Sequence, residues 1–172
     1  MSALLIAPFS RIEETVRRHR PSHLLTVMDL PVATPEGIAP QRHLRLSMHD
    51  IVEPAEGCVA PDSSHIAELV SFAKTWTRAS PFLVHCWAGI SRSTAAAYIV
   101  LCELHGPGHE ARIANALRFH APHAQPNRLM VRHADLLLGR EGRMIAAVAA
   151  MGEARPVWEG EVVELPLTLE EL

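Results

Sequence analysis

Two residues in the middle of the chain have the types and the spacing to handle a phosphate group. Five residues separate Cys86 from Arg92 in the stretch FLVHCWAGISRST, which spans residues 82–94. A thiolate is a strong nucleophile, and a guanidinium donates two parallel N–H bonds to phosphate oxygens, which a lysine cannot do. The pair therefore indicates nucleophilic attack on a bound phosphate.

The residues around this pair favour an anion-binding loop. The apolar run 82–84 predicts a short strand before Cys86, and the apolar, alanine-rich stretch from Ser93 to about Leu104 predicts a buried helix after it. A tight loop that enters a helix N-terminus points backbone N–H groups inward, and the helix dipole adds positive potential. Gly89 permits the positive φ or the close approach that such a loop needs. The residues predicted to hold the phosphate are Trp87, Ala88, Gly89, Ile90, Ser91 and Arg92.

The same arrangement assigns roles to three neighbouring side chains. A thiol at a helix N-terminus loses its proton more readily than a free thiol, so we expect Cys86 to be a thiolate. Ser93 is placed to donate to the sulfur when it leaves in a second step, and His85 to brace the loop through its ring nitrogens.

The stretch HCWAGISRS resembles the His-Cys-x-x-Gly-x-x-Arg-Ser/Thr signature of cysteine-dependent protein tyrosine phosphatases. The size is most similar to the compact dual-specificity-like and bacterial branch, and the resemblance covers about residues 23–138. It implies that Cys86 forms a phosphocysteine intermediate, that Arg92 and the loop hold the phosphoryl oxygens, and that Ser93 assists thiolate departure. It also implies no metal or other cofactor, and a phosphorylated protein or small phosphomonoester as substrate. Phosphate, sulfate or vanadate would bind in the loop.

The family also needs an aspartate as general acid upstream of the cysteine, because a positioned proton donor accelerates departure of the leaving group by about 10²–10⁴. Asp50, in LRLSMHDIVEP, is the first candidate, and Asp62 is the second, although it stands where a helix cap is needed. Asn127 resembles the family's Pro-Asn segment and either supports the site or caps a late helix.

Rival functions stay open at this stage. Phosphatases for phosphoinositides or inositol phosphates tend to carry a lysine in the loop, and residues 87–91 contain none. Rhodanese-like and arsenate-reducing proteins also use a loop cysteine, but Gly89 with Arg92 and Ser93 disfavours them. A phosphate-binding module without turnover usually lacks the cysteine, the arginine or the acid, and all three are present here.

The flanking elements predict an α/β fold. Strands are expected at about 3–7, 23–28, 44–48 and 82–84. Helices are expected at about 12–20, 63–76, 93–104, 109–120, 127–138 and 141–151. A capping box from Ser10 to Glu13 is expected to open the first helix. We expect a small central sheet of four to five mostly parallel strands flanked by helices, with a helical C-terminal half, as in phosphotyrosine protein phosphatases. Residues 1–152 form the predicted domain, and the acidic tail 153–172 lies over the surface or is loose.

The composition limits the kinds of partner and the cellular location that we expect for this protein. The net charge is −3, so no basic surface suggests a nucleic acid or an anionic membrane as partner. No apolar run is long enough to span a membrane, and three cysteines do not form a disulfide framework, so we expect a cytoplasmic protein. Cys102 is expected in the core, whereas Cys58 is either a partly buried bystander or a redox partner of Cys86.

Three further features each have two interpretations. Trp87 either stacks on a phosphotyrosine ring at the rim of the site or packs outward against helices. His49 either tunes Asp50 or points to solvent. His120 and His123 are expected on the surface, because no Cys/His spacing matches a zinc site.

Overall fold

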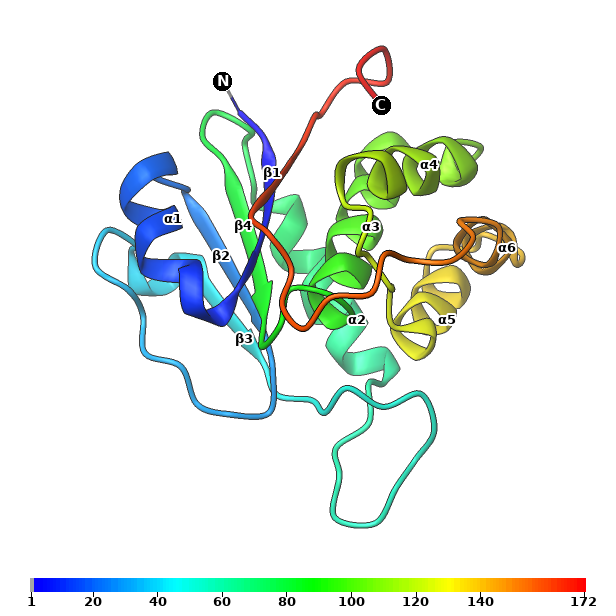
Figure 1. The fold of residues 1–172 in the computed structure, drawn as a ribbon, viewed down its shortest axis with the longest axis horizontal. Coiled ribbons are helices and arrows are strands. Elements are labelled where there is room, and N and C mark those ends of the chain that lie inside the picture. Colours follow the sequence, from blue (N-terminus) through cyan, green and yellow to red (C-terminus); the bar gives the residue numbers. More distant parts are fainter. Residues whose placement is uncertain (1) are drawn as a thin grey trace.

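The computed structural model describes residues 2–172, so that Met1, the first residue of the predicted domain 1–152, lies outside the described part. Within that range the chain forms five β-strands and six α-helices (Figure 1). In chain order they are β1 (Leu4–Pro8), α1 (Ile12–His19), β2 (His23–Val27), β3 (His43–Leu46), α2 (Ser63–Lys74), β4 (Phe82–Cys86), α3 (Arg92–His105), α4 (Glu110–His120), α5 (Arg128–Leu137), α6 (Arg143–Ala149) and β5 (Val163–Leu165). Two short 3₁₀ helices, η1 (Phe9–Arg11) and η2 (Pro40–Arg42), complete the set.

The strands form one central sheet in the order β3-β2-β4-β1-β5. The first four strands are parallel, and β5 runs antiparallel to β1 at one edge. The predicted α/β fold with a small, mostly parallel sheet is therefore confirmed. Because the carboxyl ends of parallel strands meet at one edge of a sheet, the residues that follow β2, β3 and β4 are brought together there.

Helices cover both faces of the sheet. Helix α1 packs on one face through a small apolar cluster that includes Leu5, Ile12 and Val16. The other five helices lie on the opposite face over a larger core (Figure 1). Strands β1, β2 and β4 are buried at every position, because helices cover both faces of the sheet. Strands in such a place consist mostly of apolar residues in an unbroken run.

Helix α3 lies at the centre of the larger layer, and its residues from Arg92 to Cys102 are all buried. Its run of small side chains, Ala95 to Ala97, is fully buried, and small residues allow close packing against the sheet and against the neighbouring helices. The loop of residues 87–91 enters the N-terminus of this buried helix.

The predicted helix starts are partly confirmed. Asp62 caps α2, because its Oδ1 accepts hydrogen bonds from the backbone N–H groups of Ser64 and His65. The capping box predicted at Ser10 is wrong. Ser10 lies inside the 3₁₀ turn before α1, and its hydroxyl donates to Glu159 Oε1 (2.9 Å).

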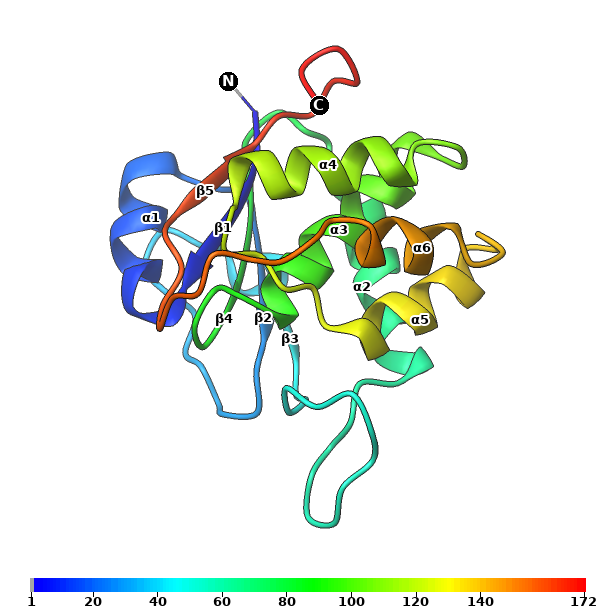
Figure 2. The same ribbon diagram turned by 45° about the vertical axis from the view of Figure 1, so that its right-hand side comes forward.

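The acidic tail lies against the domain and adds a strand that the sequence does not predict. The Arg155 amide donates to the Pro122 carbonyl, and the Gly160 amide donates to the Ala88 carbonyl in the loop of residues 87–91 (both 2.8 Å). Beyond this point β5 lies beside β1, as Figure 2 shows. Val163 and Leu165 are buried there, and Glu164 between them is exposed.

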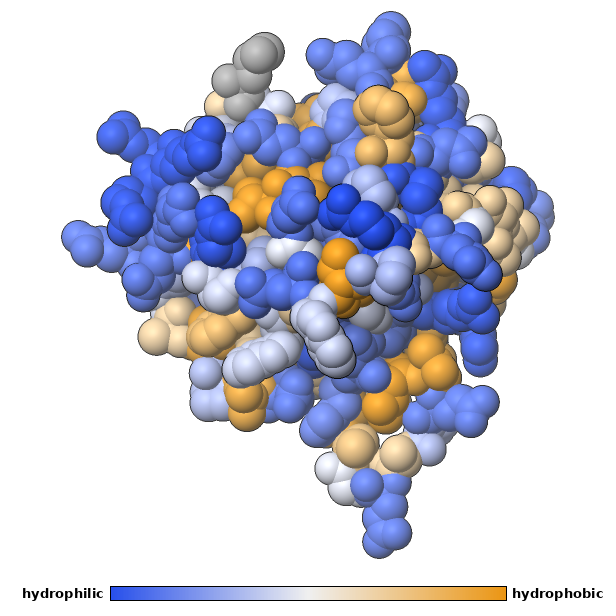
Figure 3. All heavy atoms as spheres, viewed as in Figure 1, coloured by the Kyte–Doolittle hydropathy of each residue, from blue (hydrophilic) through white to orange (hydrophobic). Residues whose placement is uncertain are grey.

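One face of the molecule is mostly hydrophilic (Figure 3). On the face viewed in Figure 3, polar residues surround small, separate apolar patches. Among residues 2–172, no helix has the length and apolarity that crossing a membrane requires.

Candidate active site

The two residues that the sequence singles out lie at the ends of adjoining elements. Cys86 is the last residue of β4, and Arg92 is the first residue of α3. Both are buried, and Cys86 Sγ lies 3.2 Å from Ser93 Oγ, within hydrogen-bond distance. The strand-loop-helix arrangement predicted for residues 82–104 is confirmed.

The loop between them turns its carbonyl groups outward. The carbonyls of Trp87, Ala88 and Ile90 accept hydrogen bonds of 2.8–2.9 Å from backbone amides of three other segments. Among residues 2–172, by contrast, no acceptor receives a hydrogen bond from the amides of residues 87–91. Amides that are left without an acceptor at a helix N-terminus form a site for an anion.

Gly89 is required by the shape of this loop. Its φ is +71°, in the left-handed region that glycine adopts most easily. A Cβ atom at this position would lie 2.9 Å from the backbone nitrogen of Pro8, which is too close for any side chain. Both conditions expected of this glycine, the positive φ and the close approach, are met.

Arg92 is held in place through one end of its guanidinium. Its Nη1 donates to Asp29 Oδ1 (3.0 Å) and to the Met48 carbonyl (2.7 Å). Its Nε, also buried, has no hydrogen-bond partner among residues 2–172. Arg92 lowers the pKa of Asp29, chiefly through this hydrogen bond, so the pair is an ion pair at neutral pH.

Asp29 is a site residue that sequence reasoning missed. It lies just after β2, whose carboxyl end is adjacent to that of β4. A carboxylate that follows a buried strand in a parallel sheet is a signal that could have identified it.

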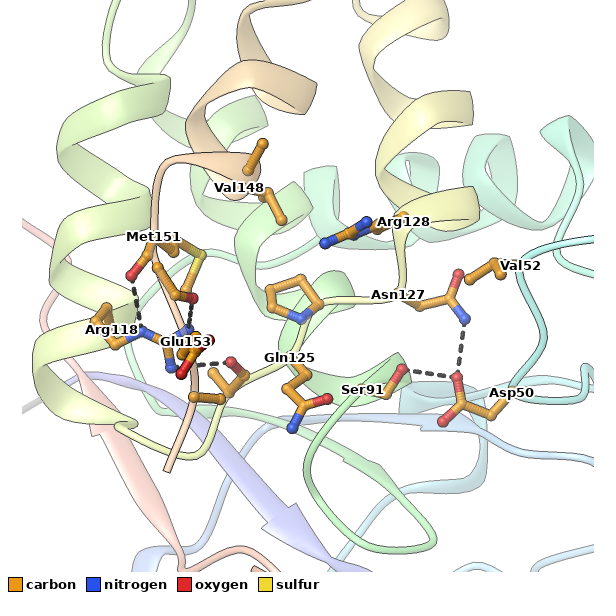
Figure 4. Close-up of a pocket in the computed structure, with 15 residues that line it drawn as sticks. Asp50, Val52, Ser91, Arg118, Gln125, Asn127, Arg128, Val148, Met151 and Glu153 are labelled. Carbon is orange, nitrogen blue, oxygen red and sulfur yellow. Dashed lines mark hydrogen bonds between the residues drawn. The ribbon is translucent and has the colours of Figure 1, made fainter. Parts of the chain in front are cut away.

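Asp50 and Asn127 are brought to the other side of the loop. Ser91 Oγ (2.7 Å) and Asn127 Nδ2 (2.8 Å) both donate to Asp50 Oδ1, as Figure 4 shows. Asn127 also caps α5, since its Oδ1 accepts from the Leu129 and Met130 amides, so both of its predicted interpretations describe part of its contacts.

The ring of His85, the residue before the cysteine, contacts the neighbouring strand. Its Nε2 lies 2.6 Å from Thr26 Oγ1 on β2, and the same hydroxyl lies 2.7 Å from His43 Nε2 on β3. Burial lowers the pKa of both His85 and His43 to about 4, so both rings are neutral at pH 7. This buried row ties three parallel strands together beneath the cysteine.

A hollow of about 420 Å³ opens above the loop. We call it the loop hollow. Its lining residues are Asp50, Cys86, Trp87, Ala88, Ile90, Ser91, Arg92 and Gln125. Trp87 is exposed and stacks on Phe9 of η1, with ring centroids 5.6 Å apart and planes at 9°. Asp62, the second candidate for the acid, does not line this hollow.

Two other predictions about side chains are corrected or refined. His123 is not on the surface: it is 1% exposed and packs so tightly beside Gly160 that a Cβ there would lie 2.5 Å from its ring. His49 neither contacts Asp50 nor points only to solvent, because its Nδ1 accepts from the Val59 amide and its Nε2 lies 3.9 Å from Asp29.

The remaining cysteines differ from Cys86. Cys102 is in the core as predicted, and burial raises the pKa of its thiol to about 12. Cys58 is half-buried and unpaired.

Comparison with solved structures decides the fold. The chain is similar to DUSP15, with 20% identity and a TM-score of 0.64 over 89% of this chain and 99% of that one. It is similar to human DUSP28 (22%, TM-score 0.61, 79% and 88%) and to the phosphatase domain of Yvh1 from Chaetomium thermophilum (20%, 0.59, 82% and 93%). The chain has the fold of the dual-specificity phosphatases. The predicted resemblance is confirmed at this level.

The same phosphatase fold occurs in a protein with a lipid-derived ligand. The structure of PTPMT1 in complex with PI(5)P matches at 16% identity with a TM-score of 0.56, over 87% of this chain and 94% of that one. No protein-family model and no curated protein matches the sequence.

Proposed function

We propose that the protein is a phosphomonoester hydrolase, specifically a protein tyrosine phosphatase that works through a phosphocysteine intermediate. The observation that carries the proposal is the loop of residues 86–92. Its free amides, the buried Cys86 and the anchored Arg92 line one hollow together with Asp50. The phosphatase fold of the comparison structures supports the same activity.

The first step transfers the phosphoryl group to the enzyme. Amides of the loop and the guanidinium of Arg92 bind the phosphoryl oxygens, which places phosphorus above Cys86 Sγ. A bond forms between sulfur and phosphorus while the bond between phosphorus and the ester oxygen breaks. Asp50, protonated, donates its proton to the departing oxygen. Ser91 and Asn127 hold the carboxyl group in position through one oxygen, which leaves the other to reach the substrate.

The second step releases phosphate. A water molecule attacks phosphorus, Asp50 as a carboxylate accepts a proton from that water, and the phosphorus–sulfur bond breaks. The electron pair returns to sulfur, which becomes a thiolate again. Ser93, whose Oγ lies 3.2 Å from the sulfur, donates a hydrogen bond to this thiolate and makes it a better leaving group.

Phosphotyrosine in proteins is the substrate that the site favours. Cys86 is only 2% exposed, so a phosphate on a long side chain reaches it more easily than one on a short side chain. Arg92 is the only cationic side chain among the described residues that line the loop hollow, which suits one phosphate group. The alternative, a phosphoinositide or inositol phosphate substrate, is favoured only by the likeness to the PTPMT1 complex.

Hydrolysis of p-nitrophenyl phosphate in the presence of a metal chelator tests the proposal. We expect the wild type to hydrolyse it, vanadate to inhibit it, and Cys86→Ser to remove the activity. A panel of phosphotyrosine and phosphoserine peptides and inositol phosphates should then show the highest kcat/KM for phosphotyrosine. Wild-type rates no higher than those of Cys86→Ser on every substrate would show that the protein is not this enzyme.

A further inference from the structure

A larger hollow lies beside the loop hollow. Its volume is about 820 Å³, against about 420 Å³ for the loop hollow. We call it the side hollow. The two share Asp50, Ser91 and Gln125, so a molecule whose phosphate sits over Cys86 can continue past Asp50 into the side hollow. Since Asp50 is the proposed proton donor to the leaving group, this is the direction in which the rest of the substrate extends.

Arg128 lies in the wall of the side hollow, and the fold does not account for it. Figure 4 shows its side chain between Val148 and Asn127. It is exposed and makes no hydrogen bond or ion pair with any of residues 2–172. It is also the first residue of α5, where a cation opposes the helix dipole and costs stability. The helix therefore gains nothing from this cation, and the guanidinium of Arg128 is open to a molecule in the side hollow.

The other charges of the side hollow differ from Arg128. Arg118 donates to four backbone carbonyl groups, so most of its N–H groups are occupied. The carboxylate of Asp50 accepts from Ser91 and Asn127. Glu153 lies near Arg118 at the other end of the hollow, away from Arg128 (Figure 4). Arg128 is therefore the lining cation that retains all its donors for an incoming anion, within the described part of the chain.

We propose that the side hollow binds the chain that flanks the phosphorylated residue of a phosphopeptide, and that Arg128 pairs with an acidic group on it. The acidic group is a carboxylate or a second phosphate. The inference rests on the proposed function and adds its substrate preference. Apolar walls at Val52, Val148 and Met151, with charges of both signs, suit the mixed side chains of a peptide. An inositol polyphosphate would need several cations near Arg92 instead.

Peptides that differ at one flanking position test the pairing. The peptides contain one phosphotyrosine and vary one flanking position at a time, within two residues on either side. Each varied position carries Glu, Gln or Lys, and kcat/KM is measured for every peptide. At one of these positions the wild type should prefer Glu over Gln by about two- to fivefold, the range of an exposed ion pair. Arg128→Gln should lose this preference, and Arg128→Glu should prefer Lys.

Arg132→Gln is the matched control. Arg132 lies one helical turn further along α5, is exposed and unpaired among residues 2–172, and does not line the side hollow. This variant should keep the wild-type preference. In about 1 M salt, where the Debye length falls to about 3 Å, the preference should shrink. A peptide with phosphoserine in place of the preferred Glu distinguishes a second phosphate from a carboxylate as the better partner.

Equal Glu/Gln ratios in the wild type and Arg128→Gln at every position would overturn the inference while leaving the proposed function intact. A higher kcat/KM for inositol phosphates than for all the peptides would overturn both the inference and the proposed preference for phosphotyrosine. If the wild type itself does not hydrolyse p-nitrophenyl phosphate, the proposed function is wrong, and the inference that rests on it is wrong as well.

Discussion

Two buried cysteines in this protein each lie near an arginine that pairs with a carboxylate, and their surroundings differ. Cys86 ends a strand, and Arg92 nearby is anchored by Asp29 at 3.0 Å. Both Cys86 and Arg92 line the loop hollow, and the amides of residues 87–91 have no acceptor among residues 2–172.

The second group is enclosed in the core. Cys102 lies within α3, and its carbonyl accepts from Arg140 Nη2 (2.9 Å). Arg140 lies 3.6 Å from Glu110, and all three residues are at most 4% exposed. Arg140 Nε, like Arg92 Nε, has no partner among residues 2–172, so a lone buried N–H does not mark a site. The open hollow and the free loop amides are what distinguish the first group.

The largest expected effect separates the two cysteines. Cys86→Ser should lower kcat for p-nitrophenyl phosphate by at least about 10⁴, since the nucleophile is lost. Cys102→Ser should keep kcat near the wild-type value. It should lower the free energy of unfolding by about 1–3 kcal/mol, because a hydroxyl in the core needs a partner. Steady-state kinetics measure kcat, and urea unfolding measures the free energy of unfolding. Equal losses of kcat in the two variants would show that Cys86 has no special role in catalysis.

Asp50→Asn tests the proposed proton donor in the loop hollow beside Cys86. For an alkyl phosphate, whose leaving group needs a proton, kcat should fall by about 10²–10⁴. For p-nitrophenyl phosphate, whose leaving group p-nitrophenolate departs readily without a proton, the rate of the first step should fall much less. Pre-steady-state rates across a series of aryl and alkyl phosphates measure the dependence on the leaving group. The same dependence in the wild type and in Asp50→Asn would remove Asp50 from this role.

Arginine-to-lysine substitutions test whether the two ion pairs have different roles. Arg92→Lys should lower kcat/KM by about 10²–10³, because an ammonium cannot keep Asp29 and two phosphate oxygens in place together. Arg140→Lys should lower stability and leave kcat/KM within about twofold. Kinetics with inorganic phosphate as competitor show whether anion binding is lost only in the first variant; equal losses in both would contradict the assignment.

The row of histidines beneath Cys86 predicts a smaller effect on stability. The pKa values of His43 and His85 are lowered to about 4 by burial, whereas in the unfolded chain they are near 6.5. Between these values the unfolded state binds more protons, so the free energy of unfolding falls as the pH drops from about 6.5 toward 4. Urea midpoints at pH 7 and pH 5 should differ, and His43→Gln should reduce the difference. An unchanged difference in that variant would show that these rings do not carry it.

Local patterns in the sequence were sufficient for the phosphate loop. The residue types of 85–93 and the apolar runs on each side predict a strand, a turn and a helix that are adjacent in the chain, so little tertiary information is needed. Asp50 was harder, because it depends on where a loop after β3 comes to lie, and yet its place after a strand pointed to the correct edge of the sheet.

The contacts that the sequence did not reveal are those between distant segments. Asp29 and Arg92 meet because β2 and β4 are neighbours, an order that no local pattern specifies. His123 is buried, and Gly160 of the tail lies directly against its ring. The strand β5 consists of three residues, which is too short for periodicity to identify it in an acidic segment.

The most direct test of the central claim is to trap the covalent intermediate. The wild type is mixed with p-nitrophenyl phosphate, quenched in acid within the first turnover and digested, and the peptides are analysed by mass spectrometry. We predict a phosphoryl group on Cys86, with none on the Cys86→Ser protein treated in the same way. A phosphoryl group on a different residue, or full turnover by Cys86→Ser, would contradict the account.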